Sequence, residues 1–236
     1  MTTYTLCGKD QRMPVRSETG YAYIINNNAW NYESFTGQQC IEVSDTTPGF
    51  LVTKSLAKSA VVMGYPNISR GPSPWAVKAA DLMPMPLSCL PRIRSSWRTL
   101  QNPTPRSKWN TSYDAWCCSS WPGQQYRTTE VMIMLNYPGP PVGEPVTMDG
   151  EQFLVRTALR TNKTGLTWRM VQYRFRRQRA SLTDFDLTPV FHDAMGRGWI
   201  TPTDLLVQVC AGFELWVGGQ GLATESFSVD VGDAAS

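Results

Sequence analysis

Residues 129–136 read TEVMIMLN, and the alternation of side chains along this stretch predicts a β-strand. Because successive side chains of a strand point to opposite faces, one face of this segment is purely apolar and the other carries an acid. The apolar face holds Val131, Ile133 and Leu135, and the other face holds Glu130, Met132 and Met134. We therefore expect a strand with one side in a protein core and a carboxylate on the opposite side.

Similar short alternating segments recur along most of the chain, separated by Gly, Pro and Asn. They are YAYIIN (21–26), GFLVTK (49–54), QFLVRTAL (152–159) and TDLLVQVCAGFELW (203–216). Many short strands with such punctuation are typical of a β-sandwich or barrel. We expect an all-β fold, and since no charge run or change of composition marks a linker, a single domain over residues 1–236.

Only one segment has convincing helical spacing. Thr183 is the expected N-cap, two aspartates follow it, and the helix is expected to stop at Gly196 and Gly198. Its apolar stripe consists of Leu187, Val190, Phe191, Ala194 and Met195. His192 is the only histidine of the chain, lies beside this stripe, and is interpreted as structural.

Composition and charge exclude several classes of function. A net charge of +3 is too small to indicate a nucleic-acid partner, and no nucleic-acid-binding motif accompanies it. The basic run RMVQYRFRRQR (169–179) alternates polar and apolar residues, so we interpret it as a half-buried strand. Its solvated face would carry Gln172, Arg174, Arg176 and Gln178.

The sequence holds no apolar run long enough to span a bilayer, and its first thirty residues lack a charged start followed by an apolar core. We expect a soluble chain, from which any secretion signal has been removed or never existed. The six cysteines form no CxxC pair, so with one histidine we expect no zinc or other metal site. One or two disulfides are possible, and these would favour an extracytoplasmic setting.

Two further acids have apolar surroundings like those of Glu130. Glu214 lies within GFELW (212–216) and would share a strand face with Cys210, Gly212 and Trp216. Asp114, within TSYDAW (111–116), would share its face with Trp116. Two carboxylates in unequal environments can hold one proton between them, as glycoside hydrolysis requires, and tryptophans stack on sugar rings. By spacing alone, the alternative that the glutamates are strand-end residues satisfied by an arginine or by water stays open.

At these residues the chain resembles glycoside hydrolase family 12, which comprises small endoglucanases and xyloglucanases of bacteria and fungi. The matching segments occur in the family's order and cover nearly the whole length. They are LCG (6–8), INNNAWN (25–31), QCIEV (39–43), GFLVT (49–53), SYDAW (112–116), TEVMIMLN (129–136), the helical segment at 182–198, and GFELWVGGQGL (212–222).

The resemblance implies a β-jelly roll of two stacked antiparallel sheets with a concave groove for a β-1,4-glucan. It also implies a retaining endo-β-1,4-glucanase without a cofactor, and carboxyl groups roughly 5–5.5 Å apart. Glu130 would be the nucleophile, Glu214 the general acid/base, and Asp114 would support the nucleophile. The residues expected to contact substrate are Asn28, Trp30, Trp116, Met132, Met134 and Trp216. A Cys7–Cys40 disulfide, secretion, and a monomer without nucleic-acid or membrane partners complete these expectations.

The sequence also departs from the family. Met134 and Arg156 stand where tryptophans are usual, Cys210 replaces a polar residue, and residues 61–71 lack the CHxG motif of many bacterial members. These changes are expected to alter sugar subsites and leave the chemistry intact. Two alternatives remain: a xyloglucan-specific endoglucanase, and a carbohydrate-binding sandwich without catalysis. We expect the neighbouring Cys117 and Cys118 to be free thiols, since a bridge between adjacent cysteines is strained.

Overall fold

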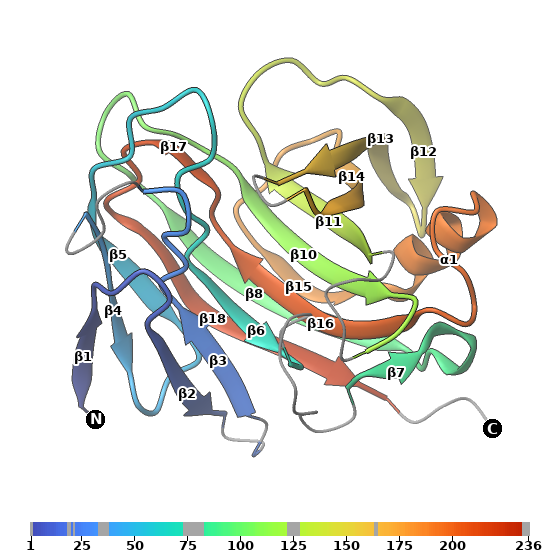
Figure 1. Ribbon diagram of the computed structural model, residues 1–236, viewed down its shortest axis with the longest axis horizontal. Coiled ribbons are helices and arrows are strands. Elements are labelled where there is room, and N and C mark those ends of the chain that lie inside the picture. The colour runs from blue at the N-terminus through green and yellow to red at the C-terminus, as the bar shows by residue number, and fades with distance from the viewer. Residues whose placement is uncertain are drawn as a thin grey trace.

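The protein is built from two stacked β-sheets with a short helix at one side (Figure 1). The computed structural model describes residues 2–17, 20, 22–32, 38–72, 83–121, 128–162 and 165–232. Residue 21, the first of the segment YAYIIN, lies outside them. Among these residues, no helix is long and apolar enough to cross a membrane.

The two sheets are formed by strands that are far apart in the sequence. The smaller sheet contains, in spatial order, β1 (Thr3–Leu6), β4 (Gln39–Ser44), β5 (Phe50–Ser55), β18 (Leu222–Val231), β8 (Ile93–Gln101) and β15 (Leu182–Asp186). The larger contains β12 (Glu144–Met148), β13 (Glu151–Thr161), β14 (Thr167–Phe175), β11 (Thr128–Asn136), β10 (Thr111–Cys118), β16 (Leu205–Gly212), β6 (Asn67–Arg70), β3 (Ala22–Asn26) and β2 (Arg12–Arg16). β7 (Met85–Pro86) pairs with β16, and β9 (Lys108–Trp109) with β17 (Leu215–Val217). Pairing is antiparallel except between β11 and β14.

One hydrophobic core fills the space between the sheets. The larger sheet contributes Val131, Ile133 and Leu135 of β11, each at most 1% exposed, as the alternation in TEVMIMLN predicts. The smaller sheet contributes side chains such as Trp97 and Phe227. The predicted all-β jelly roll is therefore confirmed. We call the face of the larger sheet that points away from this core the outer face.

The predicted strands are confirmed with small changes at their ends, but the segment at 203–216 is not one strand. It is divided into β16 and β17, with Phe213 and Glu214 between them. The backbone N–H of Phe213 donates to Pro66 O at 3.2 Å, and that of Leu215 donates to Gly64 O at 3.0 Å. Glu214 thus lies in the interruption between β16 and β17, so the direction of its side chain does not follow the period-two alternation of β16.

The prediction that a helix begins at Thr183 is wrong. Residues 182–186 form strand β15 at the edge of the smaller sheet, where Leu182 pairs with Trp97. The helix α1 spans Thr188–Gly196 and has a proline in its first turn, which is where proline is tolerated in a helix. Edge pairing to β8 therefore overrides the capping signal, while the C-terminal end at Gly196 agrees with the prediction.

The interpretation of the basic run 169–179 as a solvated strand face is also wrong in part. β14 does bury Val171, Tyr173 and Phe175 in the core, but the alternate residues Gln172 and Arg174 are only 5% and 6% exposed. They lie on the outer face, where neighbouring side chains cover them. Sequence alternation gives the face of a residue correctly but does not indicate what packs on that face.

Candidate active site

Two adjacent strands bring Asp114 and Glu130 together on the outer face. β10 and β11 pair in a register that sets Trp116 opposite Glu130 and Asp114 opposite Met132. Asp114 and Glu130 are therefore diagonal neighbours, a relation in which Cα atoms are roughly 7–8 Å apart. On the other side of β10, Cys210 of β16 lies opposite Asp114.

Glu130 is a buried carboxylate that is held by an indole. Its side chain accepts a hydrogen bond from Trp168 Nε1 at 2.8 Å, and the residue is 8% exposed. Trp168 lies on β14, and its ring is 6.5 Å from that of Trp116. Burial raises the pKa of Glu130 from 4.5 to about 7, opposed by the Trp168 hydrogen bond and by the positive charge of Arg160.

Glu214 is held by Asn110 through both its backbone and its side chain. Asn110 Nδ2 donates to the carboxylate, the Glu214 N–H donates to Asn110 Oδ1 at 3.1 Å, and the Asn110 N–H donates to Glu214 O at 3.0 Å. Burial, followed by the negative charge of Glu130, raises the pKa of Glu214 to about 7. Asn110, Arg160 and Arg174 oppose this increase.

Asp114 completes the group of acids. It is 4% exposed and accepts a hydrogen bond from Ser112 Oγ at 3.0 Å. Burial raises the pKa of Asp114 well above its usual range, and the charges of Glu130 and Glu214 add to this effect. Three acids that each oppose the ionisation of another cannot all be charged near neutral pH, so this site retains protons there.

These shifts predict a pH-dependent stability. A carboxyl group whose pKa is raised on folding stabilises the protein below its unfolded pKa, and this contribution is lost as the pH rises through the folded value. For Glu214 the loss begins near pH 4.5 and passes through about 7. Glu214→Gln cannot ionise, so we expect its free energy of unfolding to exceed that of wild type by about 1–3 kcal/mol at pH 8, and much less at pH 4.5.

Thermal unfolding of both proteins across this range measures the difference. Glu42→Gln is the matched control, because Glu42 is exposed on β4 of the smaller sheet. A stability difference between Glu214→Gln and wild type that did not change with pH would contradict the raised pKa of Glu214.

The loop after β3 carries Asn28 and Trp30, which we expected to contact substrate. Asn27, which is fully buried, anchors this loop through Nδ2, which donates to Gly8 O and Gln39 O at 2.9 and 3.0 Å. A disulfide joins Cys7 to Cys40 beside it. Asn28 has a positive φ of 42°, and Trp30 is 46% exposed. The loop therefore holds a tryptophan at the surface. The strand that leads into this loop, β3, is three strands from β10, which corresponds to roughly 14 Å.

The other expected contacts differ in their exposure. Trp116 and Trp216 are half-buried, and the ring of Trp216 lies 5.9 Å from Lys108 Nζ. Met132 and Met134 are only 1% and 2% exposed, because they pack with Tyr137, Met170 and Ala158 in a second apolar cluster on the outer face. A direct sugar contact at either methionine would require these neighbours to move.

Sequence reasoning missed two residues that hold the glutamates. Asn110 directly precedes the segment TSYDAW, and Trp168 directly precedes the basic run, so no motif singles either of them out. Both reach their partners only through strand pairing. Cys117 and Cys118 are free thiols, as expected, and Cys210, for which no expectation was made, is free as well; all three are buried.

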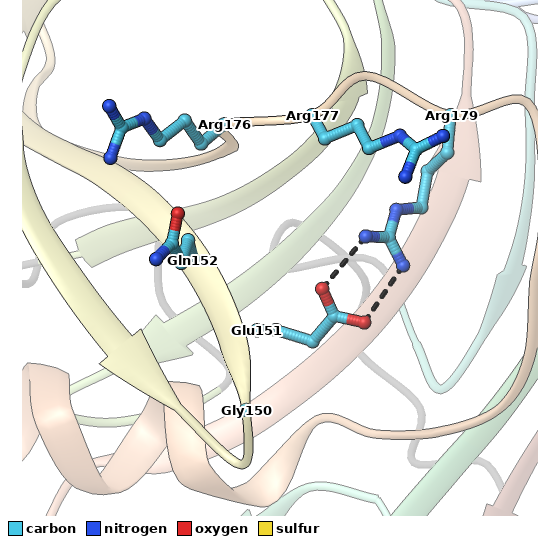
Figure 2. Close-up of a pocket in the computed structure, with 6 residues that line it drawn as sticks. All are labelled: Gly150, Glu151, Gln152, Arg176, Arg177 and Arg179. Atoms are coloured by element: carbon cyan, nitrogen blue, oxygen red, sulfur yellow. Dashed lines mark hydrogen bonds and ion pairs between the residues drawn. The ribbon is translucent and has the colours of Figure 1, made fainter.

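A depression at the far end of β14 is a separate feature (Figure 2). It is lined by Gly150, Glu151, Gln152, Arg176, Arg177 and Arg179. Met170, which pairs with Glu130, lies six residues before Arg176, or roughly 20 Å along a strand. The only acid in this lining, Glu151, is ion-paired with Arg179. The depression therefore lacks the free carboxylates that the outer face offers.

Across the described part of the chain, no cluster of three His, Cys, Asp or Glu side chains could hold a metal ion.

Comparisons with known proteins agree with this fold. The family model for glycosyl hydrolase family 12 matches residues 21–232, whereas a search of curated proteins gives no match. Endoglucanase Cel12A from Rhodothermus marinus is 31% identical with a TM-score of 0.83, over 97% of this chain and 99% of that one. A metagenome-derived family 12 endoglucanase is 31% identical with a TM-score of 0.83, over 98% of each chain. A family 12 xyloglucanase from Bacillus licheniformis shares the fold at 19% identity and a TM-score of 0.81, over 97% of this chain and 100% of that one.

Proposed function

Because the chain belongs to glycosyl hydrolase family 12 and is thus a glycosidase, we propose that it is a retaining endo-β-1,4-glucanase acting on cellulose-like or mixed-linkage β-glucan. The observation that carries the proposal is that the buried Glu130 and the half-buried Glu214 influence each other electrostatically, and that both pKa values are raised to about 7. One ionised and one protonated carboxyl group near neutral pH is the state that glycoside hydrolysis needs.

The surroundings of the two glutamates favour Glu130 as the nucleophile. The Trp168 N–H stabilises the carboxylate form of Glu130, and the resulting negative charge helps Glu214 to keep its proton. In the first step a Glu130 oxygen bonds to the anomeric carbon, the glycosidic C–O bond breaks, and the Glu214 proton passes to the leaving oxygen.

The second step reverses the role of Glu214. Once Glu130 is esterified its negative charge is gone, so the pKa of Glu214 falls and Glu214 can take a proton from water. That water bonds to the anomeric carbon, and the Glu130 ester bond breaks. Asp114, with its raised pKa, would retain a proton and support Glu130 from the diagonal position on β10.

The substrate is proposed to lie across the outer face, with the exposed Trp30 on one side of the carboxylates. Xyloglucan is the second candidate, because Met134 and Arg156 replace flat rings that could stack on a linear glucan. Initial rates on xyloglucan and on mixed-linkage glucan separate the two. We further propose action outside the cytoplasm, which the Cys7–Cys40 disulfide supports.

Trp168→Phe tests the proposed ionisation of Glu130. Losing the indole N–H removes a hydrogen bond to the carboxylate, so we expect the pKa of Glu130 to rise further. The acidic limb of the pH profile of kcat/KM should then move upward by about one unit. Trp109→Phe is the matched control, because Trp109 Nε1 is buried without a hydrogen-bond partner in the part of the chain that the structure describes. An equal shift in both variants would contradict the role of the Trp168 hydrogen bond.

The proposed function is tested by the release of reducing ends from soluble mixed-linkage β-glucan, with NMR of the first product formed. We expect cleavage at internal bonds and a β-configured new reducing end. An α-configured first product would contradict the retaining mechanism. Binding of the glucan by folded protein without cleavage would favour the carbohydrate-binding alternative.

A further inference from the structure

The outer face carries an unusual concentration of positive charge beside the glutamates. Arg156 Nε of β13 and Arg174 Nη2 of β14 both donate to one oxygen, Gln172 Oε1, at 2.6 and 3.0 Å. Arg160, four residues further along β13 and on the same face, lies close enough for its charge to act on both Glu130 and Glu214. We call Arg156, Arg160 and Arg174 the arginine cluster.

The arginine cluster lacks acidic partners. None of its members forms an ion pair with a carboxylate among the residues that the structure describes. Arg174 is only 6% exposed, stacks over Tyr137 at 5.0 Å, and has a buried Nε without a hydrogen-bond partner in those residues. Burial and the charge of Arg156 lower the pKa of Arg174 to about 10.

Two half-buried arginines elsewhere in the described chain, Arg179 and Arg197, are neutralised by acids. In Figure 2, Arg179 points at Glu151, and its two Nη atoms donate to the two carboxylate oxygens at 2.9 and 2.7 Å. Arg197 is likewise paired with Asp193 and Glu144. A buried guanidinium with an open donor is costly unless an anion joins it. The charges of Arg160 and Arg174 act on the two glutamates, but no carboxylate of the described residues is ion-paired with the arginine cluster, so the cluster can accept a further negative group.

The position of the cluster relates it to substrate. β14 and β13 lie one and two strands from β11, on the side away from Trp30. At the usual strand spacing, β14 is roughly 5 Å and β13 roughly 10 Å from the strand that carries Glu130. Sugar units next to the bond to be cleaved would lie over these strands. Guanidinium groups recognise carboxylates through charge-assisted hydrogen bonds.

We propose that this side of the active site binds a sugar bearing a carboxylate, so that the preferred substrate is an acidic β-glycan containing uronic acid units. This inference rests on the proposed function, since it assigns a substrate class to the same site. Arg156 and Arg160 would contact the carboxylate directly, because they are half-buried and exposed, respectively. Arg174 beneath them would supply positive charge.

A competing explanation is that the arginines act only on the glutamates. The charge of Arg160 lowers the pKa of both Glu130 and Glu214, and that of Arg174 lowers the pKa of Glu214. Under this explanation, Arg160→Gln would shift the pH profile for a neutral substrate but leave the ratio of affinities for acidic and neutral glycans unchanged.

The experiment compares cellopentaose with the same oligosaccharide oxidised at C6 to carry one glucuronate unit. Binding is measured by calorimetry in full-length Glu130→Gln protein, in which turnover is prevented. We expect the acidic oligosaccharide to bind about tenfold more tightly, and this preference to decrease as salt is added. Adding Arg156→Gln should reduce the preference to near parity.

Arg176→Gln is the matched control, because it removes one exposed positive charge directly after β14 and should preserve the preference. Equal affinities for the two oligosaccharides, or a preference that survives both Arg156→Gln and Arg160→Gln, would overturn the inference. If the wild-type protein cleaves neutral glucan and shows no preference for the acidic form, this inference is wrong but the proposed function stands. Failure to cleave either glycan would instead contradict the proposed function.

Discussion

Glu130→Ala is expected to lower kcat on mixed-linkage β-glucan by roughly 10⁴-fold or more, because the variant lacks the group that forms the covalent intermediate. The cavity left by the side chain gives a small anion access to the anomeric carbon. Added azide should therefore restore turnover of a substrate with an activated aryl leaving group. The product should be an α-glycosyl azide, since azide would attack the face that Glu130 normally occupies.

Glu42→Ala is the control for this experiment, because it removes an exposed glutamate from the smaller sheet. Circular dichroism establishes that both variants are folded. Near-normal activity of folded Glu130→Ala would show that Glu130 is not the nucleophile. Rescue by azide with a β-configured product would mean that the roles of the two glutamates are exchanged.

Glu214→Ala should have an effect that depends on the leaving group. On glucan, whose leaving oxygen needs a proton, we expect a loss of about 10²–10⁴-fold. On an aryl glycoside with a good leaving group, the first step should stay close to the wild-type rate and the intermediate should accumulate as a burst. The alkaline limb of the pH profile, which reflects loss of the Glu214 proton near pH 7, should disappear.

Azide should also distinguish this variant, since attack on the glycosyl-enzyme yields a β-glycosyl azide. Glu214→Gln provides an isosteric comparison that keeps an acceptor and a donor near Asn110. Equal losses on glucan and on the aryl glycoside would contradict a general acid at Glu214 and indicate a structural effect.

Much of the outer face could be predicted from period-two alternation. The alternation predicts that Glu130 and Asp114 lie on the face opposite the core, because their neighbours in sequence are apolar. The partners of the acids could not be predicted in this way. Trp168 reaches Glu130 through a parallel pairing of β14 with β11, and Asn110 reaches Glu214 where β9 meets β17. Such contacts depend on which strands become neighbours, and local periodicity carries no information about that choice.

The two errors in secondary structure share a physical cause. Residues 182–186 follow a capping pattern, yet β8 offers them an open sheet edge, and hydrogen bonds to that edge outweigh a weak helix preference. Residues 213 and 214 continue the alternation of β16, yet the backbone leaves the strand there: Phe213 and Leu215 donate to residues 66 and 64, and Glu214 bonds to Asn110. In both places tertiary hydrogen bonds decide the local structure.

The hydrogen bonds that hold the two glutamates join distant parts of the chain. Asn110 and Glu214 are 104 residues apart, and Glu130 and Trp168 are 38 apart. Closing such long loops is slow and depends on the sheets having formed, so the site should assemble late in folding. Until then both glutamates should titrate with their ordinary pKa near 4.5. The rate at which the two glutamates take up protons at neutral pH would therefore report the rate of the last step of folding.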